Sequence, residues 1–144
     1  MLYTIEGKVK NIAVVHQYVL RLIKELNLDR LKRELDIEFV NSLEDEDIWG
    51  YCWGDNENVY IQIHKHDGTR KFAFLEMMLT LTHEMVHARQ YLRGELKLKN
   101  GDRVWNDSDG EHFSYEDAPW EIEARTLEKE LFLKVFPFDM PFKN

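Results

Sequence analysis

Residues 71–92 read KFAFLEMMLTLTHEMVHARQYL, and this segment is the most informative part of the sequence. Its apolar side chains lie nearly all round a helix instead of along one stripe, a pattern typical of a helix at the centre of a domain. The second half of the segment nevertheless carries His83, Glu84 and His87. Burying three ionisable side chains is costly unless they are paired or bind a metal ion. The segment therefore predicts a central helix that carries a polar site.

Residues 83–87, HEMVH, form an H-E-x-x-H motif on this predicted helix. Residues four apart lie one above the other on one helix face, so the imidazoles of His83 and His87 can both reach one Zn²⁺ at about 2.0–2.1 Å. Glu84 lies beside this pair and can meet a water molecule at the metal without binding the metal itself. We expect zinc to lower the pKa of that water and Glu84 to act as the general base. The alternative is a helix whose histidines and glutamate face solvent or one another.

A catalytic zinc site also needs a third protein ligand and one open position. A histidine six residues after His87 would extend the motif, but that position is Arg93. The third ligand must therefore come from further along the chain. The candidates are Glu121, Glu123 and His112.

Helix geometry favours Glu121 among these candidates. A last helix is expected over 119–135, because its first residue is a proline and a second proline follows shortly after its end. Glu121 and Glu123 lie about 200° apart around such a helix, so only one of them can face the metal. Ala124 shares the face of Glu121 and would let the two helices pack closely. We therefore predict Glu121 as the third ligand, with Glu123 pointing elsewhere and His112 as the alternative.

The rest of the chain predicts an α+β fold in a single domain over residues 1–144. We expect an N-terminal helix, a small antiparallel sheet of about three strands, the central helix and the C-terminal helix. Two of the strands flank a polar, turn-forming stretch and are expected to form a hairpin. The expected segments are a helix over 8–27, strands over 37–40, 48–53 and 59–64, a loop over 93–118, and an extended tail after 136.

The composition restricts the classes of function. The 17.3 kDa chain of 144 residues is the size of one domain, and its 44% apolar content is enough for a core. Its net charge of −8 makes it a poor candidate for general binding to nucleic acids or anionic membranes. No apolar run approaches the ~20 residues that span a bilayer, and the first ten residues carry no secretory segment. Cys52 is the one cysteine, which excludes an internal disulfide, so we expect a cytoplasmic location.

Two motifs together resemble those of a known family. The pairing of HEMVHARQ at 83–90 with PWEIEA at 119–124 is similar to that of the gluzincin-type zinc metallopeptidases, and especially of small SprT-like or phage-encoded proteins with the zincin fold. In gluzincins the third ligand is a glutamate on the helix after the active-site helix, often followed three residues later by alanine. This pattern maps onto Glu121 and Ala124. Many gluzincins then have an aspartate that supports a ligand, whereas this chain has Arg125.

The resemblance covers about residues 75–130 and implies a zincin-like fold, bound Zn²⁺ and hydrolysis of a peptide or protein substrate. It identifies neither the substrate nor the oligomeric state. In such a fold the strand before the active-site helix usually runs along the cleft. The resemblance therefore implies that residues 59–64 pair with an extended substrate, and the alternative is an ordinary sheet edge.

Zinc-dependent peptide hydrolysis is the function that we predict. One alternative is a zincin-fold protein that binds zinc in a binding or structural role, although such a role needs the ligands and not the base Glu84. Another is an SprT-like protease acting on DNA-associated proteins. The acidic chain and the lack of a zinc-ribbon cysteine set argue against a nucleic-acid partner, although residues 70–99 carry six basic and three acidic groups.

The reaction also needs a hydrogen-bond donor near the metal, because negative charge develops on the substrate oxygen in the transition state. The candidates are Tyr115, His112, Tyr91 and Arg103. Tyr115 lies closest in sequence to the predicted ligand helix, and we predict it as the catalytic donor. The alternative is that these side chains lie on the surface or pack against their neighbours.

Overall fold

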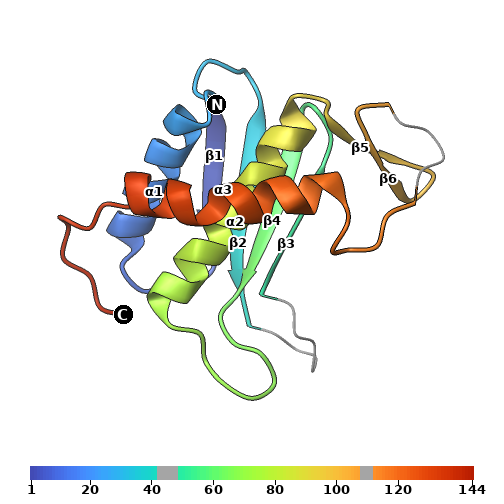
Figure 1. The fold of residues 1–144 in the computed structure, drawn as a ribbon. Helices are drawn as coiled ribbons and strands as arrows, with labels where there is room; N and C mark the ends of the chain where they lie inside the picture. The colour runs from blue at the N-terminus through green and yellow to red at the C-terminus, as the bar shows by residue number, and fades with distance from the viewer. Residues whose placement is uncertain (42–48, 108–111) are drawn as a thin grey trace.

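The computed structural model describes residues 1–41, 49–107 and 112–144 of the chain. In these residues, two helices cover one face of a four-stranded sheet, and a third helix lies across the second one (Figure 1). A two-stranded hairpin lies beside this body, next to the end of the second helix (Figure 1). This arrangement is of the α+β class that the sequence predicts. The elements in chain order are β1 (Leu2–Glu6), α1 (Ile12–Glu25), β2 (Glu34–Val40), β3 (Gly50–Gly54), β4 (Asn58–His64), α2 (Phe74–Leu92), β5 (Leu96–Lys99), β6 (Asp102–Trp105) and α3 (Pro119–Val135).

The sheet is mixed, whereas the sequence analysis predicted an antiparallel one. Its order is β1-β2-β4-β3, in which β1, β2 and β4 run parallel and β3 runs antiparallel to β4. The prediction was wrong because β2 pairs in parallel with β4 instead of with its sequence neighbour β3, and because the unexpected β1 adds a second parallel pair, for which α1 is the crossover. The predicted hairpin of β3 and β4 is confirmed. Ile48, the first residue predicted for its first strand, lies outside the described residues.

The position of β4 overturns one expectation about the substrate. β4 pairs with β2 on one side and with β3 on the other, so both of its backbone edges are occupied. The expectation that residues 59–64 pair with an extended substrate is therefore wrong. Among the described residues, β3 pairs with no strand other than β4, so β3 is one of the two edge strands, with β1 at the opposite edge.

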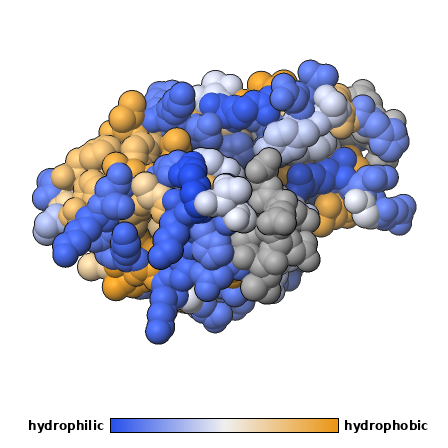
Figure 2. Space-filling model, turned by 90° about the horizontal axis from the view of Figure 1, so that it is seen from below, coloured by the Kyte–Doolittle hydropathy of each residue, from blue (hydrophilic) through white to orange (hydrophobic). Residues whose placement is uncertain are grey.

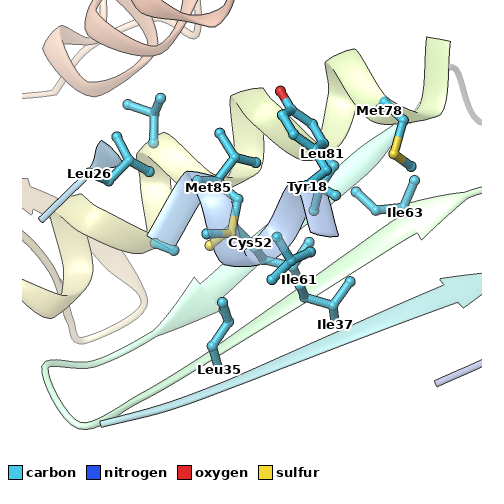
Figure 3. Close-up of a cluster of buried hydrophobic side chains, with 14 of the residues drawn as sticks. Tyr18, Leu26, Leu35, Ile37, Cys52, Ile61, Ile63, Met78, Leu81 and Met85 are labelled. Atoms are coloured by element: carbon cyan, nitrogen blue, oxygen red, sulfur yellow. The ribbon is translucent and has the colours of Figure 1, made fainter. Parts of the chain in front are cut away.

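The hydrophobic core lies between the sheet and helices α1 and α2. Alternate residues of β2 and β4 point into it, because successive strand residues face opposite sides of a sheet. Figure 3 shows how the buried side chains of four elements meet there: Tyr18, Leu35, Ile37, Ile61, Ile63, Met78, Leu81 and Met85. Burial of one large apolar side chain contributes ~1.5–3 kcal/mol. The core therefore holds α2 firmly, in the central position that its composition predicts.

The segment 93–118, predicted as a loop, begins with the hairpin of β5 and β6. Two residues in the left-handed region, Asn100 with a φ of 52° and Gly101 with a φ of 83°, connect the two strands. Asn-Gly is the residue pair that such a two-residue turn prefers, because both positions need a positive φ. The loop prediction was wrong here because strands of four residues carry little periodicity of their own.

The end of the chain packs back onto the start of α2. The backbone N–H of Leu75 donates to the side-chain oxygen of Asn144 at 2.8 Å, which satisfies one of the free amides at the helix start. A turn closed by the N–H of Met140 and the carbonyl of Pro137 replaces part of the extended tail that was predicted. These contacts fix the N-terminal end of the central helix.

The surface at the lower end of the molecule is uneven in polarity. Figure 2 shows hydrophobic side chains gathered on the side where α1 and the C-terminal tail lie, with hydrophilic side chains over most of the remaining coloured surface. Leu20 of α1 and Phe138 of the tail are among the exposed hydrophobic residues. None of the helices in the described parts of the chain is long and apolar enough to cross a lipid bilayer.

Candidate metal centre

Two helices bring together the three residues predicted as metal ligands. His83 and His87 lie one turn apart on α2, and Glu121 lies in the first turn of α3. Glu121 Oε1 is 3.0 Å from His83 Nε2 and 3.1 Å from His87 Nε2, and the two Nε2 atoms are 3.2 Å apart. These residues form a group that could hold a metal ion. We call them the His-His-Glu cluster.

The three atoms form a nearly equilateral triangle. Ligand atoms about 2.0–2.1 Å from a tetrahedral metal ion would lie about 3.3–3.4 Å from one another. The observed sides are only slightly shorter, so a metal ion fits with little movement of the side chains. Its fourth position would then be open.

A carboxylate from α3 orients the first imidazole of the cluster. His83 Nδ1 lies 2.8 Å from Oε2 of Glu128. A carboxylate only accepts hydrogen bonds, so Nδ1 of His83 is the donor and its Nε2 faces the cluster with a lone pair. Glu128 follows Glu121 by seven residues, which places both on the same face of α3. Glu128 was not predicted from the sequence, although its seven-residue spacing from Glu121 was a signal that could have identified it. Many gluzincins have a ligand-supporting aspartate where this chain has Arg125, and here Glu128 supports a ligand instead.

An amide from α2 itself orients the second imidazole. Gln90 is fully buried, and its Nε2 donates to the carbonyl of Trp120 at 3.0 Å and to Oε1 of Glu123 at 3.1 Å. Its Oε1 therefore faces His87, whose Nδ1 donates to it at 2.7 Å. The lone pair of His87 Nε2 is thus also turned into the cluster. Sequence analysis missed Gln90, because nothing in its spacing separates it from an ordinary core-facing residue.

The orientation of the two rings turns three acceptor atoms toward one point. Three acceptor atoms, two imidazole lone pairs and one carboxylate oxygen, converge on one point with His87 only 5% and Glu121 only 3% exposed. Buried acceptors repel one another unless a proton or a metal ion lies between them. Burial alone would lower the pKa of His83, but the carboxylates of Glu121 and Glu128 raise it well above its usual value. Burial would raise the pKa of Glu121, but its two imidazole neighbours hold it well below its usual range.

The other two candidates for the third ligand lie away from the cluster. Glu123 faces Gln90 and lies 3.6 Å from the guanidinium of Arg89, so it points elsewhere, as predicted. His112 is exposed, and the described residues that gather around the possible metal position do not include it. Ala124, predicted to allow close packing of the helices, is fully buried.

Glu84 lies beside the cluster and lines the same cavity. It is only 6% exposed, and burial is the main reason why its pKa is raised above the usual value for a glutamate. Gly50 of β3 passes close above it, since a Cβ at this position would lie 3.2 Å from Glu84 Cγ. The placement fits a carboxylate that meets a water molecule at the metal without binding the metal.

The cavity has a volume of about 690 Å³ and two different walls. One wall, the helical wall, consists of α2 and α3 with the cluster. The other, the strand wall, consists of β3 and the β5–β6 hairpin, which contributes Arg103. The N–H of His64 donates to the carbonyl of Trp49 at 2.9 Å, and bonded residues alternate along an antiparallel pair. The backbone groups of Gly50 and Cys52 therefore point away from β4, toward the open edge and the cavity.

The four candidate donors differ in their placement. Tyr115, the predicted catalytic donor, lines the cavity but is 66% exposed on its loop, and partial burial together with nearby carboxylates raises the pKa of its hydroxyl. Arg103 also lines the cavity, 4.0 Å from Oε2 of Glu121. Tyr91 is buried and is not among the residues that line the cavity, and burial raises its pKa to about 12. His112 lies outside the cavity lining.

Comparisons with models of protein families, with curated proteins and with solved structures found no match to this chain. The interpretation of the site therefore depends on its own residues.

Proposed function

We propose that this protein is a zinc-dependent metallopeptidase with a zincin-like fold. The observation that carries the proposal is the convergence of three buried acceptor atoms on one point, with the carboxylate of Glu84 beside them at an open cavity. Two imidazoles and one carboxylate with an open fourth position form a donor set typical of catalytic zinc. A bound zinc ion would polarise a substrate carbonyl and lower the pKa of a coordinated water molecule.

Glu84 distinguishes this proposal from a purely structural metal site. A structural zinc ion usually takes four protein ligands, whereas this cluster has three among the described residues. Burial raises the pKa of Glu84 above its usual value, and a more basic carboxylate suits a group that takes a proton from water and passes it to the leaving amine. A non-catalytic zinc protein would need the ligands but not this carboxylate.

The open edge of β3 supports a peptide as the substrate. Gly50 and Cys52 direct backbone groups toward the cavity, and an extended peptide can add to such an edge as a further strand. The Cys52 side chain is buried, and a Cβ at Gly50 would meet Thr80 and Glu84 of α2, so a peptide on this edge would lie beside the helix that carries the two histidines of the cluster. β3 therefore takes the role that the sequence analysis assigned to residues 59–64.

Cleavage of a peptide library tests the proposal. The zinc-loaded protein is incubated with peptides of mixed sequence, and the products are identified by mass spectrometry. We expect cleavage by the wild type, and a loss of at least ~10²-fold in Glu84→Gln with zinc content unchanged. Glu130→Gln, which changes an exposed glutamate on α3, is the matched control and should cleave like the wild type. Equal cleavage by the wild type and Glu84→Gln, or none by either, would contradict the proposal.

A further inference from the structure

The β5–β6 hairpin places Arg103 at the edge of the His-His-Glu cluster. Its guanidinium lies over the ring of Tyr51, with 5.7 Å between the guanidinium carbon and the ring centroid. Its Nη2 atom lies 3.5 Å from the carbonyl oxygen of Cys52, and its Nη1 atom lies 4.0 Å from Oε2 of Glu121. The side chain keeps 27% of its area exposed, on the side of the cavity. Arg103 is thus held by three neighbours and still faces the site.

Among the described residues, Arg103 forms one long ion pair, with Glu121 at 4.0 Å, and no hydrogen bond to a carboxylate. Arg70, at the other end of the cavity region, forms two hydrogen bonds of 2.8 and 2.9 Å with Glu76. Arg103 has no carboxylate within hydrogen-bond distance among the described residues, since Glu121 at 4.0 Å directs its other oxygen toward the two histidines. A guanidinium has five N–H groups in a fixed fork. The contacts with Cys52 and Glu121 do not use all five, and the side chain lines the cavity.

The position of Arg103 relative to the metal is fixed through Glu121. Oε1 of this carboxylate faces the histidines, and Oε2 of the same carboxylate faces Arg103. The guanidinium therefore lies against the coordination shell that the cluster would form. A donor in this place is oriented before a substrate arrives, and preorganised donors stabilise developing charge most effectively.

We propose that Arg103 is a catalytic residue that donates hydrogen bonds to the substrate oxygen on which negative charge develops. The proposal rests on the proposed peptidase function. When the water oxygen bonds to the carbonyl carbon, the electron pair of the C=O double bond moves onto the carbonyl oxygen, which Arg103 contacts. When the C=O bond forms again, the C–N bond breaks, and the leaving amine receives the proton that Glu84 took from the water.

The structure favours Arg103 over Tyr115 for this role. Tyr115 is 66% exposed, whereas the Arg103 side chain is 27% exposed and is held by β3 and α3. A role limited to supporting Glu121 is the competing explanation, because the same contact would stabilise the ligand. The two roles predict different results for metal binding and for anion binding.

Anion binding to the cobalt-loaded protein separates these roles without using activity. Acetate and imidazole both enter an open metal position and change the visible spectrum of Co²⁺, but only acetate is negatively charged. We expect Arg103→Gln to weaken acetate binding at least tenfold while imidazole affinity and cobalt stoichiometry stay at wild-type values. Arg30→Gln, which changes an exposed arginine, is the control. Unchanged acetate affinity of the cobalt-loaded variant would overturn the proposal. This holds whether or not the variant binds cobalt more weakly than the wild type.

Kinetics add a second readout. Arg103→Gln should lower kcat by ~10²–10³-fold with little change in KM, because the contact forms only as charge develops. Arg103→Lys should recover part of the loss, since it keeps the charge but not the fork. A rise in KM with unchanged kcat would overturn the proposal. Failure of the peptidase function would appear separately, as a wild type that binds zinc and acetate but cleaves no peptide.

Discussion

The two walls of the cavity consist of different kinds of secondary structure. The helical wall holds the cluster on α2 and α3, which are 19 and 17 residues long. The strand wall consists of β3, which has five residues, and of the hairpin strands, which have four each. Ligands on long buried helices are oriented by many contacts, whereas the strand wall offers backbone groups and one arginine. We infer that the helical wall determines metal affinity and carries the proposed base Glu84, whereas the strand wall positions the bound substrate and the groups around it.

Among the substitutions that test this division of roles between the two walls, the largest effect is expected at Glu128 on the helical wall. Glu128→Leu removes the acceptor of the His83 Nδ1–H and should weaken zinc binding ~10–100-fold, as measured by competition with a chelator. Glu128→Gln should lose much less, because an amide oxygen can accept the same bond, as Gln90 does for His87. The rate of the fully loaded variants should change little. Equal zinc affinities of Glu128→Leu and the wild type would contradict the role of Glu128 in orienting His83.

Gly50 on the strand wall should show the opposite behaviour. A Cβ at this position would lie 2.6 Å from Thr80 Cγ2 and 3.2 Å from Glu84 Cγ, so Gly50→Ala should displace the base. We expect kcat to fall ~10-fold or more while zinc affinity stays unchanged, because small displacements of a catalytic group are costly. Adding Thr80→Ser removes the closer methyl group and should restore part of the rate. A loss of zinc affinity in Gly50→Ala would contradict the division between the walls.

A smaller effect concerns Glu76, which lies in the first turn of α2. It pairs with Arg70 and accepts the backbone N–H of Ala73 at 2.9 Å, and these bonds lower its pKa to about 2. Its stabilising contribution is fully present above the unfolded pKa near 4.5 and is lost as the pH falls through about 2. Because the pair is partly exposed, Glu76→Gln should cost at most ~1 kcal/mol at pH 7. Urea unfolding of the metal-free proteins should show this difference shrinking toward pH 2, and a constant difference would refute the attribution.

The helical wall was predictable from the sequence because its geometry is local. The four-residue spacing of His83 and His87 determines that both face one side of a helix, whatever surrounds them. The angular separation of Glu121 and Glu123 showed that only one of them can face the metal, and Ala124 on the face of Glu121 decided between them. The supporting residues Glu128 and Gln90 were not found, because their roles depend on how the second helix crosses the first.

The strand wall was harder to predict, because strand order is a tertiary property. Nothing within residues 59–64 shows whether that strand lies inside the sheet or at its edge, and its parallel pairing with β2 made the sheet mixed. The hairpin that carries Arg103 did have a local signal in Asn100 and Gly101. That signal was overlooked within a long polar segment.

The proposal that His83, His87 and Glu121 bind one zinc ion is best tested by measuring zinc content with elemental mass spectrometry. The measurement compares the wild type with Glu121→Ala and His112→Ala, all purified in the same way and reconstituted with zinc. We expect about one zinc ion per chain in the wild type and in His112→Ala, and none or very little in Glu121→Ala. Full zinc content in Glu121→Ala together with loss in His112→Ala would contradict it, as would the absence of zinc from the reconstituted wild type.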